Sequence, residues 1–233
     1  MNIYKKIYHS HIRKCAGTSF NKLILGKECD QNQESRDKIY SSLCGSNSLL
    51  LNGKIYLCHN NHLINQGNYY YAFSHSPYWS LKFDDDTFIF TNFRDPVKRV
   101  ISHYQMIKEY YDENNNHPCM MTEGKWLGKD KTFKEFLSNM PIQHSHAQLY
   151  HYSKNLDISE ALVNIDRINF VGRVETLSEK GYEELGKICP NLSIPNEHLR
   201  KSKPQKISED DYNFAKEFLK KEFDLIQNIK FSY

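Results

Sequence analysis

Residues 11–20 read His11-Ile12-Arg13-Lys14-Cys15-Ala16-Gly17-Thr18-Ser19-Phe20, and they join a predicted strand to a predicted helix. The residues from Ile7 to Ile12 are rich in β-branched and aromatic side chains, which favours a strand. After the turn, Phe20, Leu23 and Ile24 recur at the spacing of one helix face. The basic segment between them therefore lies where a strand ends and a helix begins.

A turn in this position is suited to binding an anion. The first N–H groups of a helix have no partner within the helix, and the aligned peptide dipoles leave partial positive charge there. Gly17 lets the backbone approach a ligand closely, and Thr18 and Ser19 supply hydroxyls. Lys14 adds a full positive charge. Gly-Thr-Ser alone is more typical of an ordinary capped helix, but the whole segment predicts a phosphate or sulfate site.

The segment is not the Walker A loop of nucleotide hydrolases, because that pattern places its lysine after the glycines and directly before Ser or Thr. It resembles instead the 5′-phosphosulfate-binding loop of sulfotransferases that use 3′-phosphoadenosine 5′-phosphosulfate (PAPS). The likeness is to the carbohydrate branch, with its heparan-sulfate 2-O-like, Golgi-type and bacterial members. Those loops read like His-Ile-Pro-Lys-Thr-Ala-Gly-Thr-Ser, and here Arg13 replaces Pro and Cys15 replaces Thr. The resemblance implies that PAPS is bound by Arg13, Lys14, Cys15, Ala16, Gly17, Thr18 and Ser19.

A second basic turn follows a buried strand predicted at Thr87 to Phe93, with Asp95 as the cap and Pro96 as the first residue of a helix. Residues 94–104 read Arg94-Asp95-Pro96-Val97-Lys98-Arg99-Val100-Ile101-Ser102-His103-Tyr104. They resemble the motif Arg-Asp-Pro-x-x-Arg-x-x-Ser-x-Tyr with which the same sulfotransferases bind the 3′-phosphate of the donor. The resemblance gives that role to Arg94 and Ser102. Lys98 and Arg99 are interpreted as a solvated basic helix end.

The resemblance also implies a catalytic set. Lys14 would neutralise charge on the leaving phosphate without a metal, and adenosine 3′,5′-bisphosphate would be released. His75 occupies the place of the family's general base, with His59 and His62 as runners-up and His103 as a helix residue near the 3′-phosphate. Further contacts are assigned to the acceptor, at Tyr78 and Trp79, and to the donor, at Lys201 and Ser202 of a closing basic loop.

Strands and helices alternate along the chain, which predicts a layered α/β fold with a mainly parallel sheet. The resemblance implies the three-layer arrangement of P-loop-like proteins. Further strands are predicted at 54–59, 69–75 and 169–171, and further helices at 132–140, 142–152, 157 onward, 176–188 and 208–229. Residues 27–53 read as a polar connection with a weak helical patch at 36–43, and residues 60–68 read as a loop.

Composition narrows the class of protein. A chain of 233 residues with 39% hydrophobic and 25% charged residues suits one globular domain, residues 1–233. The net charge of +3 gives no support for a general nucleic-acid binder. The sequence shows neither a signal peptide nor a membrane span, and its scattered cysteines favour reduced thiols. We therefore expect a cytoplasmic protein; the oligomeric state is left open.

The resemblance thus implies transfer of a sulfuryl group from PAPS to a hydroxyl, on a glycan or glycolipid in preference to a phenol or peptide tyrosine. Two alternatives stay open: a nucleotide kinase of P-loop type, and a non-catalytic module that binds nucleotides or sulfated glycans. A zinc site at Cys58, His59 and His62, or at His144 and His146, is disfavoured because the spacing fits no common structural site.

Overall fold

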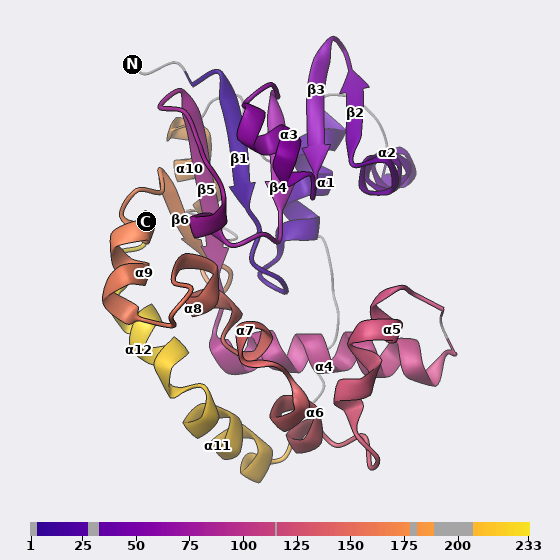
Figure 1. Ribbon diagram of the computed structural model, residues 1–233. Coiled ribbons are helices and arrows are strands. Elements are labelled where there is room, and N and C mark those ends of the chain that lie inside the picture. The colour runs from indigo at the N-terminus through magenta and orange to yellow at the C-terminus, as the bar shows by residue number, and fades with distance from the viewer. Residues whose placement is uncertain (1–3, 28–32, 115, 178–180, 189–206) are drawn as a thin grey trace.

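The computed structural model describes residues 4–27, 33–114, 116–177, 181–188 and 207–233. Its centre is a six-stranded sheet with the strand order β2-β3-β4-β1-β5-β6 (Figure 1). The strands are β1 (Lys6–Ser10), β2 (Ser48–Leu51), β3 (Lys54–Cys58), β4 (Tyr71–Ser74), β5 (Thr87–Phe93) and β6 (Phe170–Arg173). Neighbouring strands are parallel except β2 and β3, which form an antiparallel hairpin. The predicted α/β fold with a mainly parallel sheet is confirmed.

Helices cover both faces of this sheet, which gives the three-layer arrangement. One face packs against α1 (Gly17–Lys27), α2 (Gln33–Ser46) and α10 (Tyr182–Ile188). The other packs against α3 (Asn61–Gln66), α8 (Ala147–Tyr152), α9 (Ile158–Ile165) and α12 (Lys220–Asn228). In the chain, the short helix η1 (Tyr78–Ser80) follows β4 and precedes β5.

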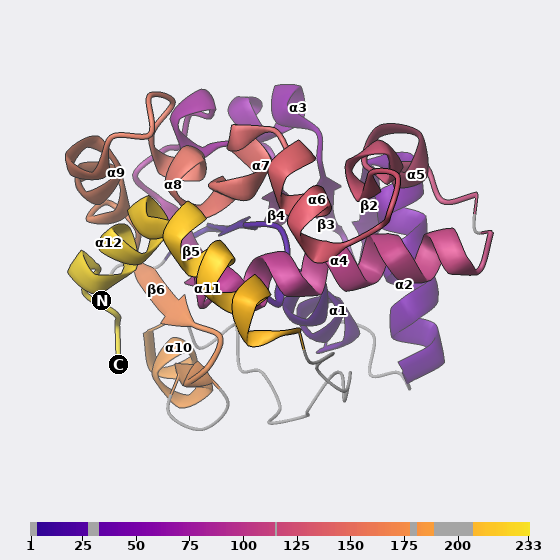
Figure 2. The same cartoon turned by 90° about the horizontal axis from the view of Figure 1, so that it is seen from below.

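A further group of helices packs together beyond the carboxyl ends of β1 and β5, as Figure 2 shows from that side. It contains α4 (Pro96–Asp112), α5 (Cys119–Thr122), η2 (Gly124–Leu127), α6 (Phe133–Asn139) and α11 (Glu209–Phe218), and α7 (Ile142–Ser145) leads from it to α8. Val97, Val100 and Ile107 form the buried stripe of α4, which was expected from their helical spacing. These helices therefore lie opposite the turns that follow β1 and β5.

The direction in which the chain adds strands reverses between β1 and β5. All residues of both strands are buried, as expected for central strands of a parallel sheet. The chain leaves β1 toward β2, β3 and β4, whereas it leaves β5 toward β6 on the other side. In open α/β sheets, ligands bind at the carboxyl ends of two strands whose connections diverge in this way. Both predicted basic turns lie there.

Two segments that the sequence predicts to be largely irregular contain regular structure. The connection predicted at 27–53 contains α2, which is longer than the predicted patch, and the edge strand β2. Asn52 and Gly53 join β2 to β3 with positive φ angles of 50° and 73°, a pairing typical of two-residue hairpins. The loop predicted at 60–68 contains α3, capped by the side chain of Asn60, which accepts a hydrogen bond from the Leu63 N–H.

Candidate active site

The first basic turn has a constrained backbone. Lys14 and Ala16 adopt left-handed conformations with φ angles of 68° and 62°, which cost a non-glycine residue about 1 kcal/mol or more each. The Cys15 N–H donates a hydrogen bond to the Ile12 carbonyl at 3.2 Å. Helix α1 begins directly after the turn, at Gly17. Such backbone conformations concentrate at functional sites, where the surrounding structure holds them in place.

Gly17 is required by the packing of the turn against β1. A Cβ atom at this position would lie 1.8 Å from Cδ2 of the buried His11 ring. The sequence predicts that Gly17 allows a close approach to the backbone. In the structure the group that approaches Gly17 is the His11 imidazole.

We expect G17A to lower the free energy of unfolding by about 1–3 kcal/mol, because the added methyl group must displace the His11 ring or the turn. Gly45 in α2 provides the matched control, since a Cβ there meets nothing within 4 Å. G45A should raise stability by up to about 1 kcal/mol, because alanine is the better helix former. Urea denaturation measures both variants; a G17A protein as stable as the wild type would contradict this packing.

The second basic turn contacts the first directly. Arg94 follows β5, and its Nη1 donates a hydrogen bond to the Lys14 carbonyl at 3.1 Å. Its Nε is buried and has no hydrogen-bond partner among the residues that the structure describes. Asp95 caps α4 by accepting from the Lys98 N–H at 2.8 Å, as predicted. The two turns, about eighty residues apart in sequence, therefore form one basic surface.

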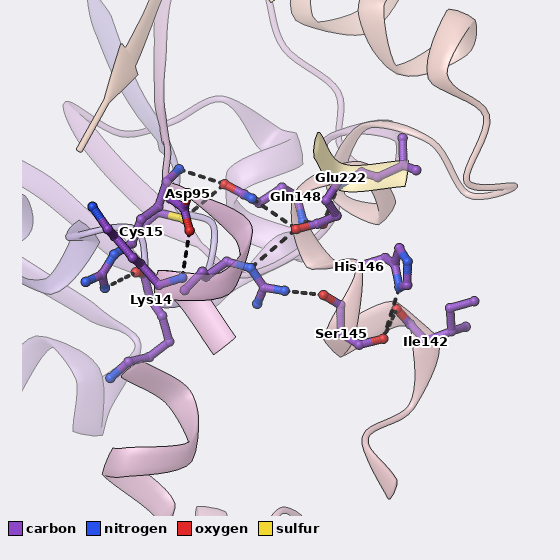
Figure 3. A network of polar contacts seen from close by, with 12 residues as sticks. Lys14, Cys15, Asp95, Ile142, Ser145, His146, Gln148 and Glu222 are labelled. Carbon is purple, nitrogen blue, oxygen red and sulfur yellow. Dashed lines mark hydrogen bonds and ion pairs between the residues drawn. The ribbon is translucent and has the colours of Figure 1, made fainter. Parts of the chain in front are cut away.

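A buried ion pair supports the second turn (Figure 3). Arg99 and Glu222 are fully buried, with 3.6 Å between Arg99 Nε and Glu222 Oε2. Glu222 accepts hydrogen bonds from the Gln148 N–H at 2.7 Å and from its side-chain amide at 3.0 Å. The amide oxygen of Gln148 accepts in turn from the Arg94 N–H at 2.7 Å and from the Cys15 thiol at 3.6 Å. Gln148 thus connects both turns to the ion pair.

The prediction that Arg99 belongs to a solvated helix end is wrong. Its guanidinium is buried and also donates to the Ser145 carbonyl. The prediction holds for Lys98, which is exposed. The burial of Arg99 follows from its position on the core-facing side of α4, where Glu222 of α12 supplies the opposite charge.

Lys14 extends toward α4. Its Nζ lies 3.5 Å from the Met106 sulfur, and Ser102 lies four residues before Met106, on the same face of the helix. Ser102 itself is partly exposed. The structure therefore brings Lys14, Arg94 and Ser102, all predicted to bind the donor, together beyond the carboxyl ends of β1 and β5.

Arg13 has a different environment from the rest of the predicted donor-binding residues. It forms an ion pair with the nearly buried Glu123, which also accepts a hydrogen bond from His103 Nε2 at 2.6 Å. Burial lowers the pKa of His103 to about 4, so the neutral ring donates to the carboxylate. His103 lies on α4, as predicted, and it ties the first turn to the helical group through Glu123.

The remaining residues of the first turn differ in exposure. Thr18 is exposed and Ser19 and Ala16 are partly exposed, whereas Cys15 is buried. Burial raises the pKa of the Cys15 thiol to about 12. The Cys15 side chain therefore belongs to the core. Lys201 and Ser202 lie outside the described residues.

His75 lies directly after β4, next to the first turn. Its Nδ1 is 2.9 Å from the His11 carbonyl oxygen, which can only accept, so Nδ1 carries the proton and Nε2 keeps its lone pair. The ring packs between those of His11 and His59, at centroid distances of 4.3 and 4.7 Å. Desolvation by the surrounding protein, followed by the charge of a protonated His59, lowers the pKa of His75.

The runner-up histidines are placed differently. The His59 Nδ1 accepts the His75 N–H at 3.3 Å, so His59 supports the backbone of His75. His62 is exposed on α3, where it contacts Gln66 at 3.0 Å. Of these histidines, His75 is the one bonded to the backbone of the first turn.

The side chains of the two residues predicted to bind the acceptor substrate also make contacts within the protein. The Trp79 indole N–H donates to the Tyr150 carbonyl at 2.8 Å, and Tyr78 stacks on Phe83 at a centroid distance of 5.5 Å. Both residues are half-buried in η1. These contacts hold the loop that follows His75. Only the exposed part of each ring is available to contact an acceptor substrate.

The described residues contain no group of three His, Cys, Asp or Glu side chains that could hold a metal ion. Within the same residues, no helix has the length and apolar content needed to cross a membrane.

Sequence reasoning missed Gln148 and Glu222. A buried glutamate opposite a buried arginine could have been suspected from Glu222, because it lies on the apolar face of a predicted helix beside Leu225 and Ile226. Gln148 carries no comparable signal in the sequence.

No protein-family description matches the sequence, and no curated protein matches it. Among solved structures, a sulfotransferase from Alicyclobacillus acidocaldarius matches over 95% of this chain and 94% of its own, with a TM-score of 0.46 and 10% sequence identity. A likeness this distant does not assign an activity.

Proposed function

We propose that this protein is a sulfotransferase that moves the sulfuryl group of PAPS to the hydroxyl of a carbohydrate acceptor. The observation that carries the proposal is the hydrogen bond from Arg94 Nη1 to the Lys14 carbonyl at 3.1 Å. It joins two basic turns that each follow a strand end, so one nucleotide with an anionic group at its 5′ side and another at its 3′ side can contact both.

The donor set fits the anionic groups of PAPS. The first turn offers the Lys14 ammonium and the amino-terminal end of α1 to the 5′-phosphosulfate. Arg94 offers a buried Nε that has no hydrogen-bond partner in the described part of the chain, and a guanidinium is suited to phosphate oxygens. Ser102 adds a hydroxyl from the face of α4 that also carries Met106. When bound, PAPS supplies the sulfuryl group, and the protein supplies the charges that hold it.

His75 is the proposed general base. Its proton on Nδ1 leaves Nε2 to accept the proton of an acceptor hydroxyl. The acceptor oxygen then bonds to sulfur while the bond from sulfur to the phosphate oxygen breaks. Adenosine 3′,5′-bisphosphate leaves with the electron pair of that bond, and Lys14 stabilises its charge.

We expect H75N to lower kcat by about 10²–10⁴-fold, because asparagine can still donate to the His11 carbonyl but offers no comparable base. His75 keeps part of its surface exposed, but desolvation by the packed protein around the ring, followed by the charge of a protonated His59, lowers its pKa. The wild-type imidazole therefore stays neutral and competent below pH 6.5, the usual histidine value. Steady-state kinetics and NMR titration of the His75 ring measure the two effects.

H62N is the matched control, since the His62 ring contacts Gln66 on α3 and lies outside the group of rings formed by His11, His59 and His75. It should retain wild-type kcat. Equal rates for H75N and wild type, or a His75 pKa above 6.5, would contradict the assignment of the base.

The function itself is tested with PAPS carrying labelled sulfate and separate pools of glycans, glycolipids and peptides. We expect label to enter a hydroxyl of the glycan or glycolipid pool, located by mass spectrometry. Transfer of phosphate from ATP with Mg²⁺ would support a kinase instead. Tight binding of adenosine 3′,5′-bisphosphate with no labelled product in any pool would support a non-catalytic module.

A further inference from the structure

Two thiols outside the proposed site are in direct contact. Cys44 lies near the end of α2 and Cys58 is the last residue of β3, and their sulfur atoms are 3.2 Å apart. Both are thiols in this structure. The contact arises because α2 packs over the β2–β3 hairpin, which brings residues 44 and 58 to the same point on one face of the sheet.

The two sulfurs need little movement to bond. A disulfide has a sulfur–sulfur distance of about 2.05 Å, so each side chain must shift by less than about 1 Å. Cys44 lies on a helix surface and is only half-buried, whereas Cys58 is fully buried. A reagent from solution can therefore reach Cys44 first, and Cys58 lies behind it.

Neighbouring groups also distinguish the two thiols. The hydrogen bond from Cys58 is the largest effect on Cys44 and lowers the pKa of its thiol; partial burial opposes this effect, and Tyr40 and the Lys22 charge add to it. The same contact, together with burial, raises the pKa of Cys58. At neutral pH Cys44 is therefore the better nucleophile, because the thiolate is the reactive form.

We propose that Cys44 and Cys58 are a redox-modification site that forms a reversible disulfide with a low-molecular-weight disulfide such as oxidised glutathione. The Cys44 thiolate attacks one sulfur of glutathione disulfide, whose S–S bond breaks and releases one glutathione thiol. Cys58 then loses its proton and attacks the Cys44 sulfur, which releases the second glutathione. The protein loses two hydrogens and two electrons, and the oxidant becomes two thiols.

The link would hold α2 against β3 immediately before His59, whose Nδ1 accepts the His75 N–H. Formation of the disulfide is nevertheless independent of the proposed sulfuryl transfer, because it uses neither PAPS nor an acceptor.

The test treats the folded, full-length protein with oxidised glutathione and then maps its thiols by alkylation and mass spectrometry. We expect alkylation of Cys44 to fall to background, a peptide pair linked through Cys44 and Cys58 to appear, and dithiothreitol to restore both thiols. Cys119 serves as the internal reference, since it is nearly buried and burial raises its thiol pKa; it should remain a thiol.

Two variants separate the roles of the cysteines. C58A should accumulate a stable glutathione adduct on Cys44, because the resolving thiol is missing, whereas C44A should leave Cys58 unmodified. Circular dichroism confirms that each variant is folded. The proposal is overturned if wild type keeps an alkylatable Cys44, or if it accumulates the glutathione adduct without the internal disulfide.

Discussion

Replacing Lys14 by asparagine is expected to lower kcat for sulfuryl transfer by about 10²–10³-fold, the loss that follows removal of one well-placed electrostatic donor. Asparagine is the informative substitution because Lys14 has a φ of 68°, and asparagine is among the residues that adopt this conformation most readily. K14N therefore removes the charge while keeping the backbone of the turn.

The control is K14R, which keeps a positive charge at the same position and should retain more activity than K14N. Single-turnover kinetics with labelled PAPS separate chemistry from product release. If K14N binds adenosine 3′,5′-bisphosphate and transfers sulfate at the wild-type rate, Lys14 has no catalytic role.

Removing Arg99 is expected to cost about 3–5 kcal/mol of folding free energy, because it leaves the Glu222 carboxylate buried without its counter-charge. R99M should also weaken donor binding, since the same carboxylate orients Gln148, which accepts the Arg94 N–H. Urea denaturation gives the stability, and calorimetry with adenosine 3′,5′-bisphosphate gives the affinity.

The double variant R99M/E222Q completes the test. Glutamine keeps an oxygen acceptor for the Gln148 N–H but carries no charge, so the double variant should lose less than the sum of the two single variants. K220M, which breaks the exposed pair between Lys220 and Asp224 on the same helix, should cost no more than about 0.5 kcal/mol. A similar loss for K220M and R99M would contradict the importance of burial.

Local signals in the sequence predicted the central strand and the helix after it. The strand at Thr87–Phe93 was predicted with its observed bounds, because it is an apolar run between charged residues, and Asp95 with Pro96 marks a helix start. The edge strand β2 was missed because it is only four residues long, and its three leucines stand between polar flanks. The signal that could have revealed it is the Asn52-Gly53 turn.

The parts of the site that depend on distant contacts were not predictable in the same way. Arg99 was interpreted as solvated because its partner Glu222 lies near the other end of the chain. The left-handed conformations of Lys14 and Ala16 carry no signal in residue type, since neither residue favours them. Gly17 was recognised as a close-contact position, but only the fold reveals that His11 makes the contact. The roles of His75, Ser102 and Trp79 stay predictions.

The central claim is that the turns at Lys14 and Arg94 hold the two ends of one nucleotide. The most direct test is calorimetric titration of wild type and R94M with adenosine 3′,5′-bisphosphate and with adenosine 5′-monophosphate, which lacks the 3′-phosphate. Wild type should prefer the bisphosphate by at least about tenfold, or 1.4 kcal/mol, and R94M should lose most of that preference. Equal affinity of wild type for the two nucleotides, or a preference that R94M leaves unchanged, would contradict it.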